Sequence, residues 1–350
     1  MTKIDDDWPE QDLESVPNCP ICGQWERTIL HAGLQDYAFR AAEGKWNMYK
    51  CSKCGIAYLD PRPTPGSIGR AYTSYYTHSN NDELPDNQTK STLQKIVRGL
   101  KNGYINHRYQ VKKNPEIRAG RWLIPLIPPI RSVADCSFRH IAASGNTRHR
   151  LLDIGCGNGS YLLLAQEAGW DVEGLDFDPE AVKTCLAAGL DVRAGGIEIL
   201  QGKKNFYDAI TLSHVIEHVH DPAKLLNKIL ALLKPGGMLW LATPNINSLL
   251  ASQYGPDWRG LEPPRHLILF NREALCFLLL QTGFSEVKQH YDMAARFIVA
   301  QSEGIKFRLP IVFNIKPHHL LSRKSLWIEF LEIMRLRKRE YLVFTAKKHL

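Results

Sequence analysis

The stretch Leu151-Leu-Asp-Ile-Gly-Cys-Gly-Asn-Gly-Ser160 decides the fold of this 350-residue chain. It starts with apolar residues typical of a buried strand and continues into a turn with Gly155, Gly157 and Gly159. Glycine tolerates positive φ and leaves the backbone open to a ligand, because it has no Cβ. A tight turn without a ligand is compatible with the same residues, so the surrounding sequence has to decide.

Strands and helices alternate after residue 150. The predicted strands are 151–154, 171–175, 191–194, 208–212, 238–242, 286–291 and 340–346. The predicted helices are 160–168, 179–188, 222–233 and 273–282, and Lys234-Pro-Gly-Gly237 is a strong stop after the third. This pattern predicts an α/β fold, with a mostly parallel seven-stranded sheet and helices on both faces.

Asp176 follows the second predicted strand, 21 positions after Gly155. A carboxylate at an offset of about 20 residues accepts hydrogen bonds from ribose hydroxyls, which favours a nucleoside ligand. Ser160 stands where a dinucleotide fingerprint has its third glycine. Asp153 would repel a pyrophosphate but suits a cationic amino group. These residues favour S-adenosylmethionine over a dinucleotide.

Four segments in order resemble the motifs of class I S-adenosylmethionine-dependent methyltransferases. They are residues 151–160, Gly174-Leu-Asp-Phe-Asp-Pro179, Asp208-Ala-Ile-Thr-Leu-Ser-His-Val-Ile-Glu-His-Val219 and Leu233-Lys-Pro-Gly-Gly237. The resemblance covers about residues 150–292. It implies that the sheet is the Rossmann-like methyltransferase sheet.

The resemblance also implies a set of cofactor contacts. The glycine turn would line the methionine and the ribose, Asp176 would hold the ribose diol, and Phe177 and Ile197 would flank the adenine. Relatives often carry an adenine-binding Asp after the third strand, where this chain has Gly196. The predicted cofactor-binding residues are Asp153, Gly155, Cys156, Gly157, Gly159, Asp176, Phe177, Ile197 and Ser213.

A histidine-rich segment, Ser213-His-Val-Ile-Glu-His-Val-His220, follows the fourth predicted strand, at the edge where ligands bind in open α/β sheets. Glu217-His218 resembles the Glu-His pair of ubiquinone-type O-methyltransferases and deoxysugar C-methyltransferases. This implies that His218 takes a proton from the acceptor and that Glu217 holds a cation, a metal or a hydroxyl. Capping of the next helix is the alternative interpretation.

His214-Val-Ile-Glu-His218 also matches the His-x-x-Glu-His pattern of inverted zincins. A peptidase of that class needs the pattern on one regular helix, and Asp221-Pro222 follows too soon for a long one. Whether His214 joins Glu217 and His218 around a metal stays open at this point.

The loop Trp258-Arg-Gly-Leu-Glu-Pro-Pro-Arg-His266 follows the fifth predicted strand, where loops lie over the substrate in the fold that the resemblance implies. Arg265 would pair with an anionic group, and His266 would add a second acid or base. A connection merely stiffened by proline is an equally good interpretation.

Two matching patterns, Cys19-Pro-Ile-Cys22-Gly and Cys51-Ser-Lys-Cys54-Gly, lie near the N-terminus. Four converging thiolates form a closed tetrahedral zinc site, which supports structure and leaves no open position for chemistry. The arrangement resembles the N-terminal zinc module of deoxysugar C-methyltransferases. The following segment, 70–76, resembles their tyrosine-bearing lid, which implies that Tyr75 or Tyr76 reaches the active site; packing of these rings against a helix is the alternative.

These features divide the chain into a zinc-binding module at 17–60, a helical linker or lid region at 61–149 and a methyltransferase domain at 150–350, with an insertion at 292–339. The acidic N-terminus lacks the apolar region of a secretion signal, and no apolar run approaches the length of a membrane span. We therefore expect a cytoplasmic protein without a transmembrane segment.

The formal charge of +8 comes with local basic clusters at 95–121 and 335–339. A solvated helix face is the first interpretation of these clusters, and a patch for an anionic substrate or a membrane surface is the second. The surplus is modest for the length of the chain, and the zinc module has no basic and aromatic stripe, which disfavours a nucleic-acid partner.

The sequence as a whole predicts methyl transfer to a small-molecule acceptor, with His218 as general base. A sugar or sugar nucleotide is the favoured acceptor, and a quinone-like or phenolic metabolite is the alternative. A hypothesis of another class is a zinc-ribbon protein that binds nucleic acid and senses the cofactor.

Overall fold

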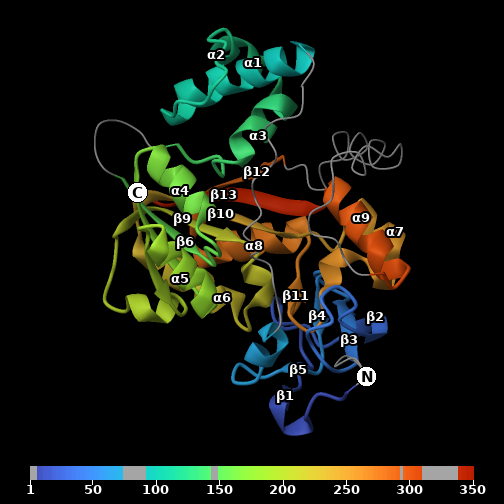
Figure 1. Ribbon diagram of the computed structural model, residues 1–350. Helices are drawn as coiled ribbons and strands as arrows, with labels where there is room; N and C mark the ends of the chain where they lie inside the picture. Colours follow the sequence, from blue (N-terminus) through green and yellow to red (C-terminus); the bar gives the residue numbers. More distant parts are fainter. Residues whose placement is uncertain (1–5, 74–91, 143–148, 292–294, 310–337) are drawn as a thin grey trace.

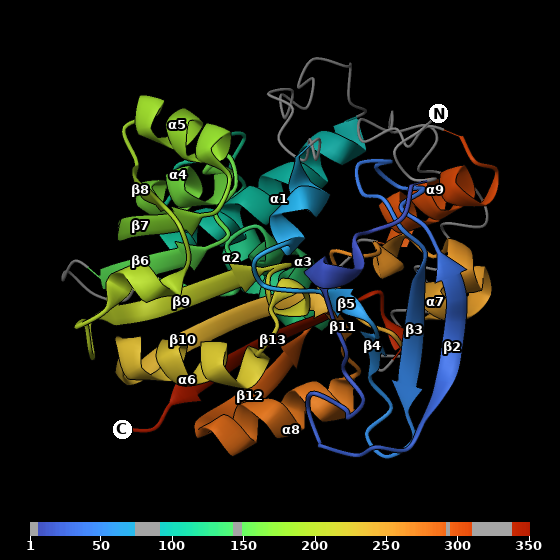
Figure 2. The same cartoon turned by 90° about the horizontal axis from the view of Figure 1, so that it is seen from below.

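The computed structural model describes residues 6–73, 92–142, 149–291, 295–309 and 338–350. Its central sheet has the strand order β12-β13-β10-β9-β6-β7-β8 (Figures 1 and 2). The seven strands are β6 (His149–Ile154), β7 (Trp170–Asp176), β8 (Asp191–Ala194), β9 (Tyr207–Ser213), β10 (Leu233–Pro244), β12 (Phe284–His290) and β13 (Tyr341–Lys348). β8, β7, β6, β9 and β10 are parallel neighbours, and β13 runs antiparallel between β10 and β12. The predicted seven-stranded α/β fold is confirmed.

Helices cover both faces of this sheet. α4 (Ser160–Glu167) and α5 (Pro179–Ala187) pack on one face, and α6 (Pro222–Leu232) and α8 (Arg272–Thr282) pack on the other. Side chains alternate along a strand, so Leu151 joins the core under α4 and α5, whereas Leu152 joins the core under α6 and α8. The two layers thus follow from the apolar residues of the buried strands.

The fifth strand is longer than the predicted 238–242. The Pro-Gly-Gly sequence does follow the end of α6 at Leu232, but the chain is already in β10 from Leu233. Its pairing with β9 shifts register between Leu233 and Met238, and Gly236 lies at a φ of 74°. The glycines therefore form an irregularity inside a strand, which a turn signal in the sequence does not distinguish from a loop.

The N-terminal module forms a second sheet, in the order β11-β4-β3-β2. Its own strands are β2 (Arg27–Leu34), β3 (Trp46–Cys51) and β4 (Ala57–Leu59), while β1 (Leu13–Glu14) pairs with β5 (Arg62–Pro63). The edge strand β11 (Ile268–Leu269) belongs to the larger domain and pairs antiparallel with β4. Buried residues of the module also share one core with the α6 and α8 face of the large sheet. The module is therefore fused to the larger domain.

Residues 92–136 form a helical unit that lies at the opposite end of the molecule from the N-terminal module (Figure 1). It consists of α1 (Thr92–Tyr109), α2 (Gly120–Leu123), the 3-10 helix η4 (Ile124–Leu126) and α3 (Pro128–Cys136). Tyr104, Ile105 and Tyr109 anchor α1 in the core with Phe138. Within the described residues, no helix combines the length and the apolar character needed to cross a membrane.

The remaining described helices are mostly short and lie between the strands, except that η2 precedes β1. They are η2 (Glu10–Asp12), η3 (Ile68–Tyr72), η5 (Ile197–Leu200), η6 (Ile216–His218), α7 (Leu249–Tyr254), η7 (Gly255–Asp257), η8 (Arg259–Leu261) and the longer α9 (Ala295–Lys306). Of the predicted insertion at 292–339, the described part is α9 with the residues just after it and positions 338 and 339.

Candidate active site

The glycine turn joins the end of β6 to the start of α4. Gly155, Gly157 and Gly159 have φ values of 72°, 53° and 77°. A Cβ on Gly155 would lie 2.6 Å from Val215 Cγ2, and one on Gly159 would lie 2.6 Å from Leu190 Cδ1. Side chains are therefore excluded here by both backbone conformation and space, and the turn presents bare backbone at the carboxyl edge of the sheet.

Asp176 ends β7 beside this turn. Its Oδ2 accepts a hydrogen bond of 2.8 Å from the Gly157 amide, and its Oδ1 accepts one of 2.9 Å from the Asp178 amide. The next side chain, Phe177, is 79% exposed. A Cβ on Gly196 would lie 2.8 Å from Phe177 Cζ, so glycine at this position lets the ring approach the backbone. Ile197 is buried in the apolar core below.

Asp153 is fully buried at the end of β6. Its Oδ1 accepts hydrogen bonds from the Arg139 guanidinium and from Thr211 Oγ1, the latter at 2.8 Å. Its Oδ2 makes no hydrogen bond within the described residues. Burial raises the pKa of this carboxyl, and the Arg139 charge opposes that rise. The nearest cation is thus an arginine of the segment before β6, which the sequence did not indicate.

A hollow of about 340 Å³ opens beside Asp153. Arg139 lines it, with its guanidinium carbon 3.7 Å from the centre of the Tyr161 ring. Residues at and just after the end of α3, in α4, at and after the end of β9 and in β10 form its wall: Cys136, Ser137, Arg139, Ser160, Tyr161, Leu164, Ser213, His214, Trp240 and Ala242. Of the predicted cofactor-binding residues, Ser213 lies in this wall.

The histidine segment begins in the same wall and turns inward. His214 has a φ of 55°, a conformation rare for residues other than glycine and frequent at functional sites. Its Nδ1 lies 3.2 Å from Oε1 of the buried Glu217, whose Oε2 accepts from Thr243 Oγ1 at 2.9 Å. Burial opposes the charge of Glu217, but His214 and the other nearby histidines hold its pKa at about 2. Glu217 is therefore a carboxylate.

His218 is held through one ring nitrogen. Its Nδ1 lies 3.0 Å from the Arg265 carbonyl oxygen and 3.0 Å from the Tyr72 hydroxyl. A carbonyl oxygen can only accept, so Nδ1 carries the proton of the neutral ring and Nε2 carries the lone pair. Because the segment holds only the short η6 between β9 and α6, it is not the regular helix that an inverted zincin requires.

His266 lies edge to face with His218, with ring centroids 4.7 Å apart. Its Nδ1 donates to the Gly260 carbonyl at 2.7 Å, and burial lowers its pKa to about 4. One ligand atom from each of Glu217, His218 and His266 falls within 4.8 Å of the others. The structure thus brings together all three predicted catalytic residues, the two histidines and the carboxylate of Glu217.

Arg265 does not face an anionic ligand, contrary to the sequence interpretation. Its side chain is fully buried, and it donates to Asp36 Oδ1 at 2.6 Å, to Glu262 Oε1 at 3.0 Å and to the Ala71 carbonyl at 3.0 Å. Buried carboxylates need a counter-charge: Arg265 supplies that of Asp36, and it shares Glu262 with Arg259. The residue therefore joins the N-terminal module to the loop that carries His266.

The four predicted zinc ligands converge. Cys19 Sγ lies 3.5 Å from Cys54 Sγ, Cys22 Sγ lies 3.6 Å from Cys51 Sγ, and all four atoms fall within 4.8 Å of one another. Each pair ends in a glycine at a φ of 71° whose amide bonds back to the first cysteine's carbonyl. Two equal turns thus direct four sulfurs to one point, the geometry of a tetrahedral zinc site.

Two residues of the site were missed from sequence, Tyr72 and Arg139. Tyr72 lies in the tyrosine-bearing segment that the sequence singled out, but the prediction named Tyr75 and Tyr76, which lie outside the described residues. Arg139 carries no motif. The one sequence feature that could have indicated a partner such as Arg139 was Asp153, because a carboxylate in a buried strand needs a nearby cation.

Part of the sequence is similar to known methyltransferases. Residues 131–289 match the family described as a methyltransferase domain. A ubiquinone biosynthesis O-methyltransferase of Xanthomonas oryzae pv. oryzae (strain PXO99A) is 37% identical over 103 residues, 27% of this chain and 43% of that protein. The enzyme of the same name from Bordetella avium (strain 197N) is 35% identical over 134 residues, 34% of this chain and 56% of that protein. The chain spans about half the length of these curated relatives.

Among solved structures, an S-adenosylmethionine-dependent methyltransferase from Archaeoglobus fulgidus aligns with a TM-score of 0.42 and 24% identity. The alignment covers 57% of this chain and 86% of that one. This likeness is too distant to add to what the strand order shows.

Proposed function

We propose that this chain, whose residues 131–289 match a methyltransferase domain, is a class I S-adenosylmethionine-dependent methyltransferase that transfers a methyl group from this cofactor to a small-molecule acceptor. The observation that carries the proposal is the pairing of a bare-backbone turn with two carboxylates, Asp153 and Asp176, at one sheet edge. Such an edge suits a ligand that combines a cationic amino acid with a ribose.

The residues of the turn fit this cofactor in detail. Asp153 Oδ2 is a buried acceptor without a hydrogen bond among the described residues, which suits the ammonium of the methionine moiety. Arg139, already in the adjacent hollow, suits the methionine carboxylate. Asp176 is oriented by two backbone amides at the position where a ribose diol would bind, and Phe177 offers an exposed ring to the adenine.

When bound, the cofactor supplies an electrophilic methyl group whose bond to sulfur breaks as the bond to the acceptor forms. His218 takes the proton that the acceptor loses, at Nε2, because the Arg265 carbonyl keeps Nδ1 protonated. Glu217 stays ionised and stabilises the imidazolium that results. His266 is neutral and buried, and its imidazole ring packs edge to face against the ring of His218.

The acceptor that we favour is a sugar or sugar nucleotide. The four-cysteine module supports this choice, because it is fused beside His218 through Arg265 and β11, as expected for a part that shapes the acceptor site. The second candidate is a quinone-like or phenolic metabolite, which the names of the curated relatives favour. A nucleic-acid partner has no support from these contacts.

We also propose that Cys19, Cys22, Cys51 and Cys54 bind a structural zinc ion. The four sulfurs leave no open ligand position, so the ion would hold the two turns together and take no part in the reaction. Metal analysis of the purified protein and of a Cys51→Ser variant tests this: about one zinc per chain is expected in the first and a clear loss in the second.

The cofactor proposal is tested by calorimetric titration with S-adenosylmethionine. Binding is expected for the wild type and for His218→Ala, and a loss of about tenfold or more is expected for Asp176→Ala. A matched control is His107→Ala, at an exposed histidine on α1 far from the site. Absence of binding to the wild type would refute the proposal.

The acceptor is identified by incubating the protein and labelled cofactor with a metabolite extract and finding the labelled product by mass spectrometry. With that product as the assay, His218→Ala is expected to reduce turnover by about 100-fold or more while cofactor binding survives. Full turnover in His218→Ala would remove its assignment as general base without affecting the cofactor proposal.

A further inference from the structure

The basic charge of this protein is concentrated in the helical unit. Residues 92–136 hold nine of the 44 Lys and Arg residues and two of the 36 Asp and Glu residues. The rest of the chain therefore has 35 basic and 34 acidic residues, so seven of the eight net positive charges belong to these 45 positions. Charge concentrated in this way creates a positive electrostatic potential around one unit of the protein, and this potential attracts anionic partners to that unit.

The same unit exposes apolar side chains. Residues 93–130 carry eight of the twenty large apolar side chains that are exposed in the described part of the chain. Leu93, Ile96 and Val97 lie one turn apart on α1 and share a face. Trp122 is 60% exposed and Leu126 is 76% exposed. Ile127 and Ile130 extend the exposed set, which we call the helical face. Such a concentration of exposed apolar side chains in one small unit indicates an interaction surface.

The helical face is not needed for the packing of the unit itself. α1 meets the 117–120 segment backbone to backbone, because a Cβ on Gly103 would lie 2.0 Å from the Ile117 carbonyl oxygen and one on Gly120 would lie 1.8 Å from the Leu100 carbonyl oxygen. Tyr104 and Tyr109 fill the inner side. Among the described residues, the outer apolar side chains are therefore not used for packing within the unit.

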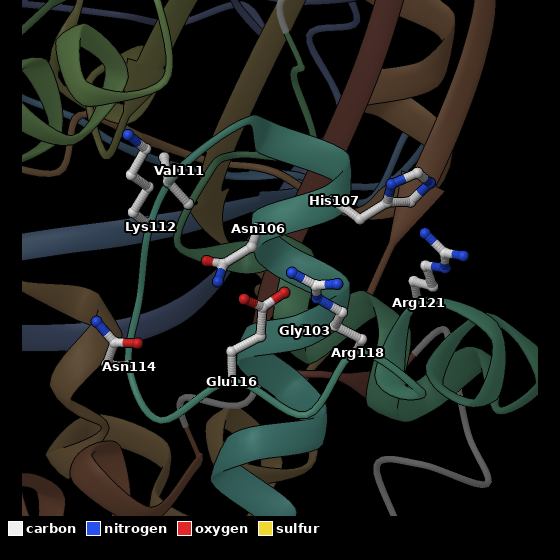
Figure 3. A pocket seen from close by; sticks show the side chains of 9 residues that line it. All are labelled: Gly103, Asn106, His107, Val111, Lys112, Asn114, Glu116, Arg118 and Arg121. Atoms are coloured by element: carbon white, nitrogen blue, oxygen red, sulfur yellow. The ribbon is translucent and has the colours of Figure 1, made fainter.

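A basic hollow of about 490 Å³ adjoins the helical face. Arg118 and Arg121 lie around it with His107 of α1, and Lys112 lies on the opposite rim, with Glu116 as the acidic member (Figure 3). The Arg121 guanidinium also stacks 3.8 Å above the Trp122 ring. Positive groups thus lie next to the apolar residues. At a bilayer surface the positive groups would meet the headgroups, and the apolar side chains would enter the adjacent acyl region.

We propose that the helical face, with its surrounding basic residues, binds peripherally to an anionic phospholipid surface. Its apolar residues are mostly Leu and Ile, which insert between acyl chains but offer nothing to a nucleic acid. A two-fold contact with a second copy would set the nine basic residues of one chain against those of the other. An anionic bilayer satisfies the charge and the apolar side chains together.

The end of α3 connects this surface to the candidate active site, since Cys136, Ser137 and Arg139 line the hollow beside the glycine turn. A protein bound through the helical face would hold that hollow near the bilayer. This placement suits an acceptor with a lipid part, whether its reacting group is a sugar or a phenol.

The test is flotation of the full-length protein with phosphatidylcholine vesicles, with and without about a third phosphatidylglycerol. Binding is expected for the anionic vesicles only, and it should weaken as salt is added. Trp122→Ser with Leu126→Ser, and separately Lys112→Glu with Arg121→Glu, should each weaken binding by about tenfold or more. Both double variants lie outside the catalytic machinery. An unchanged melting transition verifies that each variant folds.

The matched control is Phe277→Ser with Leu280→Ser on α8, whose side chains are 52% and 58% exposed. This control should float like the wild type. If the Trp122/Leu126 variant floats as well as this control, these two side chains make no particular contribution to binding, and the proposal is overturned. No flotation, together with a dimer that the Trp122/Leu126 variant dissociates, would assign the face to a second copy instead.

Discussion

The two halves of the candidate site are built in opposite ways. The cofactor half comes mostly from one continuous stretch, Asp153 to Asp176, in which a strand, a turn, a helix and the next strand bring the groups together. The acceptor half collects Tyr72, His218 and His266 from three distant segments. A local arrangement can be read along the chain, whereas an assembled one depends on how the domains pack.

Both halves nevertheless solve the same electrostatic problem. Each has a buried carboxylate that an arginine from another segment neutralises: Arg139 for Asp153, and Arg265 for Asp36. A buried charge without a partner costs several kcal/mol, so each arginine fixes the position of its own segment. We expect the assembled half to be the more sensitive of the two to loss of its arginine.

The largest effect is expected for Arg265→Met. It leaves the carboxylate of Asp36 buried without its cation and leaves Glu262 with Arg259 alone, and should lower the free energy of unfolding by about 3–5 kcal/mol. Denaturant unfolding measures the change. Arg272→Met, at a partly exposed arginine, is the control and should cost less than about 1 kcal/mol. A loss for Arg265→Met as small as that of the control would contradict the assembled-half comparison.

A smaller effect is expected for Arg139→Met, because the Asp153 carboxyl can become protonated when its counter-ion is lost. The free energy of unfolding should fall by about 2–3 kcal/mol. Adding Asp153→Asn to the same chain should restore part of the loss, and a double-mutant cycle measures the coupling. Simple additivity of the two changes would argue against a direct interaction.

The acceptor half should also make stability depend on pH through His266. Its folded pKa of about 4 is below the ordinary value of 6.5, so the unfolded state binds the extra proton between these values. The contribution is fully present above about pH 6.5 and is lost as pH falls toward about 4. In His266→Gln, the change in the free energy of unfolding between about pH 4 and 6.5 should be smaller than in the wild type by about 1–2 kcal/mol. The control His107→Gln should show the same pH dependence as the wild type.

The smallest effect is expected for Tyr72→Phe. Its hydroxyl shares His218 Nδ1 with the Arg265 carbonyl, which remains in the variant and keeps the same tautomer. Turnover should fall by no more than about tenfold, with a shifted pH profile and unchanged cofactor binding. Tyr37→Phe, which removes a hydroxyl bonded to Gln35, is the control. A loss as large as that of His218→Ala would make Tyr72 a catalytic group in its own right.

Much of the fold was predictable, because glycines, strand patterns and the paired cysteines are local signals. The seven strands were placed within a few residues, and the irregular start of β10 was the exception, since Pro-Gly-Gly predicts a stop whether or not the chain stays in the sheet. The role of Arg265 was not predictable. Its partners Asp36 and Ala71 are far away in sequence, and only packing shows that they bury it.

The sequence by itself determined the cofactor turn, the acid after β7, the convergence of four cysteines in two matching turns, and the concentration of charge in residues 92–136. Tertiary structure alone decided which histidine nitrogen is free, which arginine neutralises which carboxylate, and that β11 joins the N-terminal module to the larger domain. The physical reason is range. Backbone geometry acts between neighbours along the chain, whereas burial sets the partners of a charge among residues that only the folded protein brings together.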